Sequence, residues 1–197
     1  ELDAQYKNEA VELTWSFGGD EPTPDGQTYN YNFESGLDGW TNIDADGDGN
    51  VWQHNVAYGL TGEGSIGNNG STGFAFSQSY INYVGAINPD NYLVSPQKYA
   101  ITAGSKISFY ACAQDESYPY EHFALAVSSA GNTSASDFTS ISEWTFAGKG
   151  TCQGERSLRQ TAWVKYEVDL SEYAGQELWL AIRHFDCTDQ YFLDIDD

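Results

Sequence analysis

The sequence predicts an all-β protein that folds as a sandwich of two sheets. Aromatic residues make up 15% of the 197 residues, led by 14 Tyr and 10 Phe, which favours strands. Short strand-like runs alternate with turn residues, and no 3.6-residue period is sustained. Such spacing is typical of an antiparallel sandwich of roughly eight to ten strands. The length suits one main domain with a sizeable core.

The N-terminal region is expected to lie outside this domain. Residues 11–17 alternate apolar and polar side chains, as a half-buried strand does. Residues 18–26 are dense in Gly, Pro and Asp and read as a linker. We therefore assign residues 1–28 to the end of a preceding module plus a linker, and residues 29–197 to the main domain.

The main domain opens with a predicted strand at residues 29–34, whose aromatic side chains share one face while Glu34 lies on the other. Residues 55–78 are rich in Gly, Ser and Asn with little periodicity, which indicates a long connection that is functional or ordered by a ligand. The further predicted strands span residues 91–94, 106–113, 123–127, 141–146, 163–168, 178–185 and 191–195.

The charge of the chain argues for cations as its counterparts. The net charge of −21 comes from 29 acidic and 8 basic residues, which disfavours nucleic acid and anionic membrane as partners. Twelve acidic residues lie in the first fifty positions beside a single basic residue, Lys7. No stretch approaches eighteen consecutive apolar residues, so no membrane insertion is expected. The start at Glu1 and the lack of Met favour a piece of a longer, secreted protein.

Residues 43–50 form a candidate calcium loop. Asp44, Asp46 and Asp48 alternate with other residues and are followed by Gly49, which matches the first half of an EF-hand loop. The second half is missing, because Asn55 stands where the bidentate Glu would be. A bound ion would need ligands from elsewhere in the chain. The alternative is a solvated acidic turn.

The last strand supplies the missing ligands in our prediction. Leu193 and Ile195 should point to the core, so that Asp194 and Asp196 share the opposite face. If this strand lay beside the first, its acids would approach Glu34. We therefore predict one structural Ca²⁺ held by five carboxylates: Glu34, Asp44, Asp46, Asp48 and Asp196.

The three cysteines, Cys112, Cys152 and Cys187, allow one disulfide at most and have no CxxC spacing, so zinc is not expected. A Cys112–Cys187 disulfide is one option in an oxidising compartment. Two thiol–imidazole pairs are a further option, Cys112 with His122 or Cys187 with His184. Catalysis is not expected, because Cys112 alternates within an apolar strand as a buried side chain does.

Aromatic residues in polar segments are candidates for ligand contact. Tyr118 and Tyr120 flank Pro119 in a predicted loop, where each offers a large rigid surface with a polar tip. We take these two as the candidate ligand-binding residues. Trp40 and Trp52 are expected to pack beneath the acidic loop instead.

The chain resembles the cleaved adhesin domain, the haemagglutinin/adhesin repeat downstream of the protease domain in gingipains of oral Bacteroidetes. The resemblance covers about residues 29–197. It rests on Phe33-Glu34 with Gly36 and Trp40, the 43–50 loop with Trp52, and segments 79–82, 88–96, 112–115, 121–122, 128–139, 183–185 and 188–189 before the acidic last strand.

The resemblance implies a jelly-roll β-sandwich similar to galactose-binding and MAM-type domains, with structural calcium. It also implies binding of host proteins, haem proteins or cell surfaces, and residues 11–15 look like the last strand of a fibronectin-III-like module. The loop at residues 55–72 departs from the family's sequence, so the binding specificity of other members cannot be assigned to this chain. We expect a non-catalytic adhesin module of a secreted or cell-surface multidomain protein, such as one with a cysteine protease domain. The alternatives are a carbohydrate-binding module and a structural spacer.

Overall fold

The computed structural model describes residues 2–7, 10–15, 26–61, 66–115, 117–146 and 163–197, with side chains from residue 26 onward. Near the N-terminus, β1 (Leu2–Lys7) and β2 (Ala10–Trp15) form an antiparallel hairpin. The strand expected at residues 11–17 is confirmed over its described part. The predicted linker lies outside the described residues except for Gly26, so the division of the chain at residue 28 stays a prediction.

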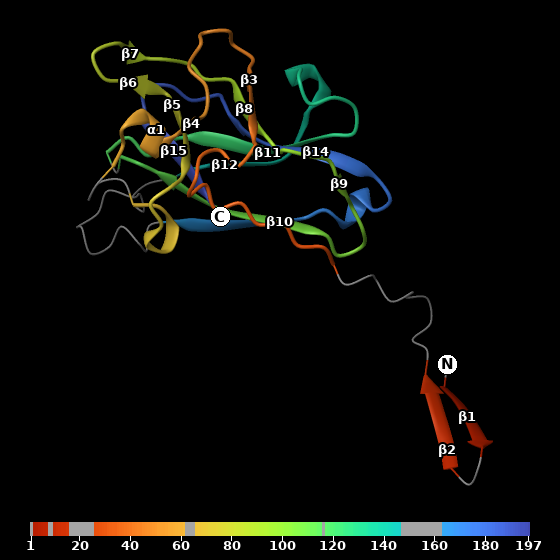
Figure 1. Ribbon diagram of the computed structural model, residues 1–197. Helices are drawn as coiled ribbons and strands as arrows, with labels where there is room; N and C mark the ends of the chain where they lie inside the picture. The colour runs from red at the N-terminus through yellow and green to blue at the C-terminus, as the bar shows by residue number, and fades with distance from the viewer. Residues whose placement is uncertain (1, 8–9, 16–25, 62–65, 116, 147–162) are drawn as a thin grey trace.

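Two antiparallel sheets make up the main domain (Figure 1). The first has the order β13-β10-β15-β5-β4, and the second has the order β12-β11-β14-β8-β3, with β9 also paired to β14. Neighbouring strands are mostly distant in sequence, as a jelly roll requires. The strands of the first sheet are β13 (Val164–Asp169), β10 (Lys106–Ala113), β15 (Phe192–Asp196), β5 (Ala75–Gln78) and β4 (Gln53–His54). Those of the second are β12 (Thr139–Thr145), β11 (His122–Ser128), β14 (Glu177–His184), β8 (Asn91–Val94), β3 (Thr41–Asp44) and β9 (Tyr99–Ala100).

The connections carry a few short elements. The strands β6 (Tyr80–Ile81) and β7 (Gly85–Ala86) form a small hairpin, and the one α-helix among the described residues is α1 (Asn55–Tyr58). Three single 3-10 turns are η1 (Asn68–Gly70), η2 (Ala135–Asp137) and η4 (Ser171–Tyr173). In the part of the chain described, no helix is long and apolar enough to span a membrane.

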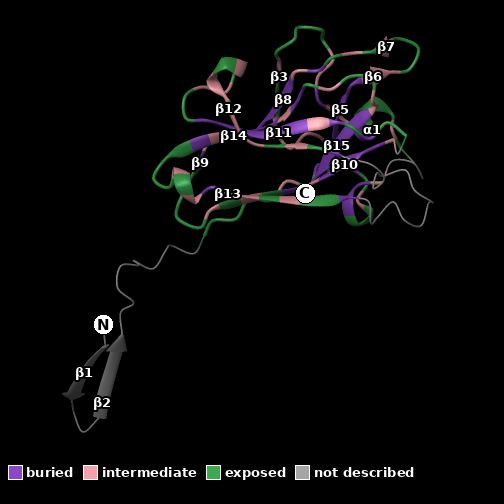
Figure 2. Cartoon of the chain, turned by 180° about the vertical axis from the view of Figure 1, so that it is seen from behind, coloured by how far each residue is buried: buried purple, intermediate pink, exposed green. Residues whose placement is uncertain are grey.

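The main core lies between the two sheets, and buried residues concentrate there in Figure 2. Strand β14 shows why: Leu178, Leu180 and Ile182 enter the core, whereas Arg183 on the other face bonds Asp90. Period-2 alternation therefore places a sheet's apolar face inward. The sandwich expected from the sequence is confirmed.

One predicted strand is wrong. Residues 29–33 form no strand and pair with none, and Phe33 adopts a left-handed φ of 50°. Their aromatic side chains still pack as the alternation predicted: Phe33 is buried in the core and Tyr29 meets Tyr99 edge to face at 4.8 Å. Conversely, β5 lies between β15 and β4 inside the segment expected to be a loop.

Candidate functional site

The three aspartates of the 43–50 loop come together as predicted. Their carboxylate oxygens lie within 4.8 Å of one another. The backbone folds around them: the N–H groups of Gly47 and Gly49 donate to the carboxylate of Asp44 at 2.8 and 3.0 Å. Both glycines have the positive φ, 75° and 81°, that such a tight loop needs. The loop follows β3, whose last residue is Asp44.

The charges in this loop are not balanced by any basic side chain that the structure records bonding to it. Burial raises the pKa of Asp46, and a hydrogen bond with Asp44 raises it further. Burial also opposes ionisation of Asp44, but the hydrogen bond with Asp46 and the N–H groups of Gly49 and Gly47 lower its pKa. The pKa values of the two carboxylates thus shift in opposite directions, and a hard cation between them would favour the ionised form of both.

Glu34 and Asp196 bond to a different segment, residues 68–73. Glu34 accepts hydrogen bonds from Thr72 N and Oγ1, both at 2.8 Å, and from Gly73 N at 3.0 Å. Asp196 accepts from Asn68 N at 2.7 Å and from Ser71 Oγ at 2.6 Å.

The five predicted ligands therefore fall into two groups in this structure. The expected placement of the last strand is wrong, because β15 pairs with β10 and β5 and not with residues 29–34. Its alternation is confirmed: Leu193 and Ile195 belong to the core, whereas Asp194 and Asp196 do not. Metal binding by either group stays a prediction.

The environment of Asp196 makes it sensitive to pH. Burial raises its pKa to about 7, although bonds from Ser71 and Asn68 oppose the shift. By contrast, the N–H of Gly73 and the hydroxyl of Thr72 lower the pKa of Glu34. Without a cation, the pKa values of the two acids that bond to the same segment thus shift in opposite directions.

We predict that the metal-free protein loses stability as the pH rises from about 4 to about 7, in part through Asp196. The folded state binds this proton more tightly than the unfolded chain, whose carboxyl has a pKa near 3.8, so raising the pH favours unfolding over that interval. The Asp196→Asn variant should show a smaller fall. Urea unfolding in chelator at several pH values measures the free energy of unfolding of both proteins. If it fell equally with pH in the unaltered protein and in Asp196→Asn, the prediction would be contradicted.

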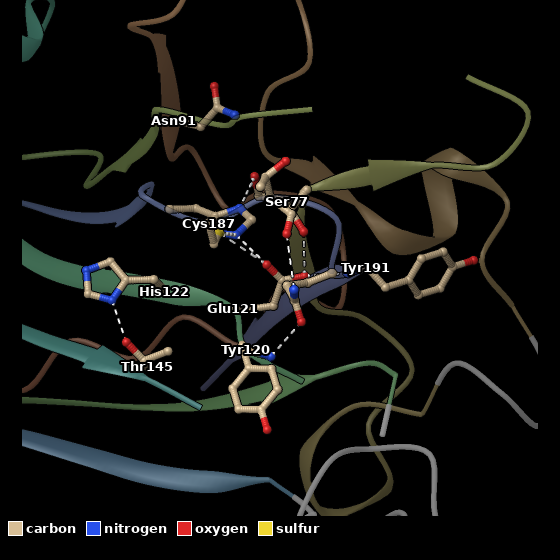
Figure 3. A network of polar contacts seen from close by, with 12 residues as sticks. Ser77, Asn91, Tyr120, Glu121, His122, Thr145, Cys187 and Tyr191 are labelled. Carbon is tan, nitrogen blue, oxygen red and sulfur yellow. Dashed lines mark hydrogen bonds and ion pairs between the residues drawn. The ribbon is translucent and has the colours of Figure 1, made fainter. Parts of the chain in front are cut away.

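A second group of ionisable side chains lies buried at one end of the sandwich (Figure 3). Nε2 of His184 is 2.9 Å from Oε2 of Glu121 and 3.1 Å from Sγ of Cys187. The other ring nitrogen, Nδ1, bonds Ser77 Oγ at 2.8 Å. Oε1 of Glu121 accepts from Ser79 Oγ and from the N–H of Tyr191 at 2.9 and 2.8 Å.

This group is not arranged as a nucleophile, base and orienting acid. A triad needs the acid and the nucleophile on opposite nitrogens of the imidazole, yet Glu121 and Cys187 share Nε2. Burial raises the pKa of the Cys187 thiol, and the charge of Glu121 adds to the shift, so the reactive thiolate is disfavoured. Cys112 is disulfide-bonded whereas Cys187 is free, so the proposed Cys112–Cys187 disulfide is wrong.

The candidate ligand-binding tyrosines are exposed. Tyr118 and Tyr120 retain 52% and 54% of their accessible surface. Sequence reasoning missed Tyr83 and Val84, at 106% and 74%, which lie in the turn between β6 and β7. That turn joins two strands of two residues each, which are too short to show a periodic pattern in the sequence. Trp52 is buried as expected, and its Nε1 donates to the carbonyl of Asn91. The preceding residue, Asp90, donates its N–H to the carboxylate of Asp46, so Trp52 lies near the acidic loop.

Both exposed segments adjoin residues 189–191. The N–H of Tyr120 donates to Oε1 of Gln190 at 3.0 Å, and Nδ2 of Asn82 donates to the hydroxyl of Tyr191 at 3.1 Å. The loop with Tyr118 and Tyr120 and the β6–β7 turn therefore both contact the segment of residues 190–191. We call Tyr83, Val84, Tyr118 and Tyr120 the aromatic end of the domain.

Comparison with known proteins assigns the fold to a family. The sequence model of the Cleaved Adhesin Domain matches residues 28–197. Hemagglutinin A of Porphyromonas gingivalis is 37% identical over 175 residues, which are 86% of this chain and 6% of that relative. Gingipain R1 of the same species is 36% identical over 174 residues, 86% of this chain and 10% of that relative. The chain thus spans a tenth or less of the length of these two relatives.

A solved structure agrees with the sequence matches. The K1 cleaved adhesin domain of Lys-gingipain from Porphyromonas gingivalis W83 superposes with a TM-score of 0.71 and 38% identity, covering 87% of this chain and 95% of that domain. The family model and the solved Lys-gingipain domains that match are adhesin domains, and on that ground the chain is a non-catalytic module. The resemblance inferred from the sequence is confirmed, and the chain belongs to the Cleaved Adhesin Domain family.

Proposed function

We propose that this chain is a binding module of a secreted or cell-surface multidomain bacterial protein, and that it attaches the protein to host proteins or host cell surfaces. The observation that supports this most is its membership of the cleaved adhesin family over residues 28–197. The relatives are named hemagglutinins and gingipains and are many times longer than the matched segment. Neighbouring domains of the same polypeptide are therefore expected partners.

The aromatic end is the surface that we assign to binding. Side chains of Tyr with more than half their surface exposed supply rigid apolar area at low entropic cost, which is what protein interfaces use. In Figure 3 the ring of Tyr120 points away from the buried polar group. The same rings can also stack on sugars, so the experiment must separate protein from glycan ligands.

A pull-down from plasma or mucosal extract, run beside a glycan array, tests the proposal. The Tyr118→Ala/Tyr120→Ala double variant should lose a host protein that the unaltered chain retains. Tyr29→Ala is the control, because Tyr29 is 41% exposed and contacts Tyr99, next to the start of β14 and remote from the aromatic end. Glycan binding that the double variant abolishes would favour a carbohydrate-binding module, and silence in both assays would favour a spacer.

We further propose that Ca²⁺ stabilises the domain, with Asp44, Asp46 and Asp48 as ligands. Their oxygens converge within 4.8 Å, and calcium prefers oxygen ligands from such Asp-rich loops. Water molecules would complete a shell of six to eight oxygens. Because the ion binds only the folded loop, the free energy of unfolding rises by RT ln(1 + [L]/Kd), about 2.7 kcal/mol at a hundred times Kd.

We predict that millimolar Ca²⁺ raises the melting temperature by about 5–10 °C relative to chelator, as that free energy implies for a domain of this size. Asp46→Asn should remove most of the shift in calorimetry. Glu34→Gln, which changes the other acidic group, should retain it. The opposite pattern would move the ion to the segment bonded by Glu34 and Asp196, and no shift in the unaltered protein would refute calcium stabilisation.

A further inference from the structure

The buried group at the end of the sandwich contains three different metal-ligand atoms that point at one place. Oε2 of Glu121, Nε2 of His184 and Sγ of Cys187 form a triangle with sides of 2.9, 3.1 and 3.3 Å (Figure 3). Glu121 and His184 are fully buried, while Cys187 is partly exposed. We propose that these three side chains form a binding site for a divalent transition-metal ion of the zinc class.

The donor set suits such an ion better than calcium. One imidazole nitrogen, one thiolate and one carboxylate oxygen are the ligands that zinc takes in proteins, whereas calcium takes oxygen alone. A carboxylate and a thiolate together carry two negative charges, which a divalent cation neutralises inside the low-dielectric interior. The bound site would thus have no net charge.

The spacing of the ligand atoms requires only a small adjustment. Tetrahedral zinc with its usual bond lengths places N, O and S ligands about 3.4–3.6 Å apart. The three atoms here are nearer to one another, at 2.9–3.3 Å, as hydrogen-bonded groups are. An outward shift of about half an ångström brings them to the tetrahedral separation. The partly exposed side of Cys187 gives the ion a path in and leaves room for a solvent ligand.

The surrounding residues orient each ligand as the outer shell of a metal site does. Ser77 Oγ holds Nδ1 of His184, which directs Nε2 toward the other two atoms. Ser79 and the N–H of Tyr191 occupy Oε1 of Glu121 and leave Oε2 facing the site.

The backbone of the site is fixed by β-ladder pairing. In the β11–β14 ladder, His184 lies opposite Phe123. Phe123 follows Glu121 by two residues, so the ladder holds Glu121 close to His184. After β14 the chain turns back at once, with the N–H of Phe185 bonded to the carbonyl of His122 and a left-handed Asp186 at φ 49°. That turn brings Cys187 back to His184. Sequence reasoning paired Cys187 with His184 but missed Glu121, because Glu121 lies just before β11, far from the other two residues in sequence, and the three show no CxxC spacing.

Cobalt provides a direct test on the whole chain, kept under non-reducing conditions so that the disulfide of Cys112 stays closed. Chelator-stripped protein titrated with Co²⁺ should develop a thiolate-to-cobalt charge-transfer band and the strong visible bands of tetrahedral cobalt at one equivalent. Zn²⁺ should abolish both. The charge-transfer band should be absent in Cys187→Ser, and Glu121→Gln should bind Co²⁺ at least tenfold more weakly. Ser77→Ala, which loosens His184, should weaken binding by roughly 10–100-fold.

Asp46→Asn is the matched control, because it alters the other ligand cluster and should leave the cobalt spectrum unchanged. Circular dichroism of each metal-free variant shows whether it folds; if Cys187→Ser does not, Glu121→Gln gives the answer. A folded, unaltered protein that develops no charge-transfer band with excess Co²⁺ would overturn the proposal. So would a band that persists in Cys187→Ser, or equal affinity in Glu121→Gln.

Discussion

Replacing Phe123 by alanine is expected to lower the free energy of unfolding by about 3–5 kcal/mol, the usual range for a large buried ring. Phe123 is fully buried on β11 at the centre of an aromatic group. Its ring centroid lies 5.4 Å from that of Trp144, 5.3 Å from that of Phe146 and 5.1 Å from that of Tyr166. Since these rings come from several strands, none of them can close the cavity without moving its strand. Urea unfolding followed by tryptophan fluorescence measures the loss.

Tyr83→Ala is the control for this variant. It also removes an aromatic ring, but the ring is fully exposed in the β6–β7 turn, so the free energy of unfolding should change by no more than about 0.5 kcal/mol. If Phe123→Ala cost less than about 1 kcal/mol, or no more than Tyr83→Ala, the aromatic group would not be the close-packed centre that its geometry indicates.

The strands that the sequence predicted correctly show a clear pattern of residue types along the chain. In β14 and β15, apolar and other residues alternate, so the period-2 signal is present in the sequence. Strand β5 was missed because it has only four residues, two of them polar, and follows a segment rich in Gly, Ser and Asn, so that no period is visible. Residues 29–33 show the reverse case: the alternation was real, but it reflects packing onto the core without a strand partner.

The candidate sites divide along similar lines. The Asp44, Asp46 and Asp48 cluster is local in sequence, so its spacing alone was enough to predict it. The positions of Glu34 and Asp196 depend on which strand lies beside β15, and strand order is a long-range property that periodicity does not report.

Of the group of Glu121, His184 and Cys187, the sequence suggested only the pairing of Cys187 with His184, and the contact of both with Glu121 was not predicted. Its members stand at the ends of β11 and β14, and their meeting depends on the ladder that pairs those strands. A buried acid and imidazole lower stability unless every polar atom finds a partner, and here Ser77 and Ser79 supply those partners. Ser77 in β5 and Ser79 directly after it lie in or beside the segment predicted to be a loop, so no sign of this role was visible in the sequence.

Replacing Gly73 by alanine is expected to lower the free energy of unfolding by about 3 kcal/mol or more, because the added methyl group overpacks a backbone contact. A Cβ at this position would meet the carbonyl group of Phe33 and would lie 2.8 Å from Cα of Glu34. These are backbone atoms and cannot rotate away. The same carbonyl also bonds Nε2 of His54 at 2.7 Å, so moving it breaks a second contact.

The substitution should also disturb the acidic group that holds residues 68–73. The N–H of Gly73 donates to Glu34, and the hydroxyl of Thr72 donates to the same carboxylate, so displacing residues 33–34 separates both. Thr72→Val removes one hydrogen bond without overpacking and should cost much less. Gly26→Ala, with nothing within 4 Å of the new methyl group, should change stability by no more than about 0.5 kcal/mol. Equal melting temperatures for Gly73→Ala and Gly26→Ala would show that the segment moves aside freely, and the close packing of residues 33–34 against Gly73 would then contribute nothing to the fold.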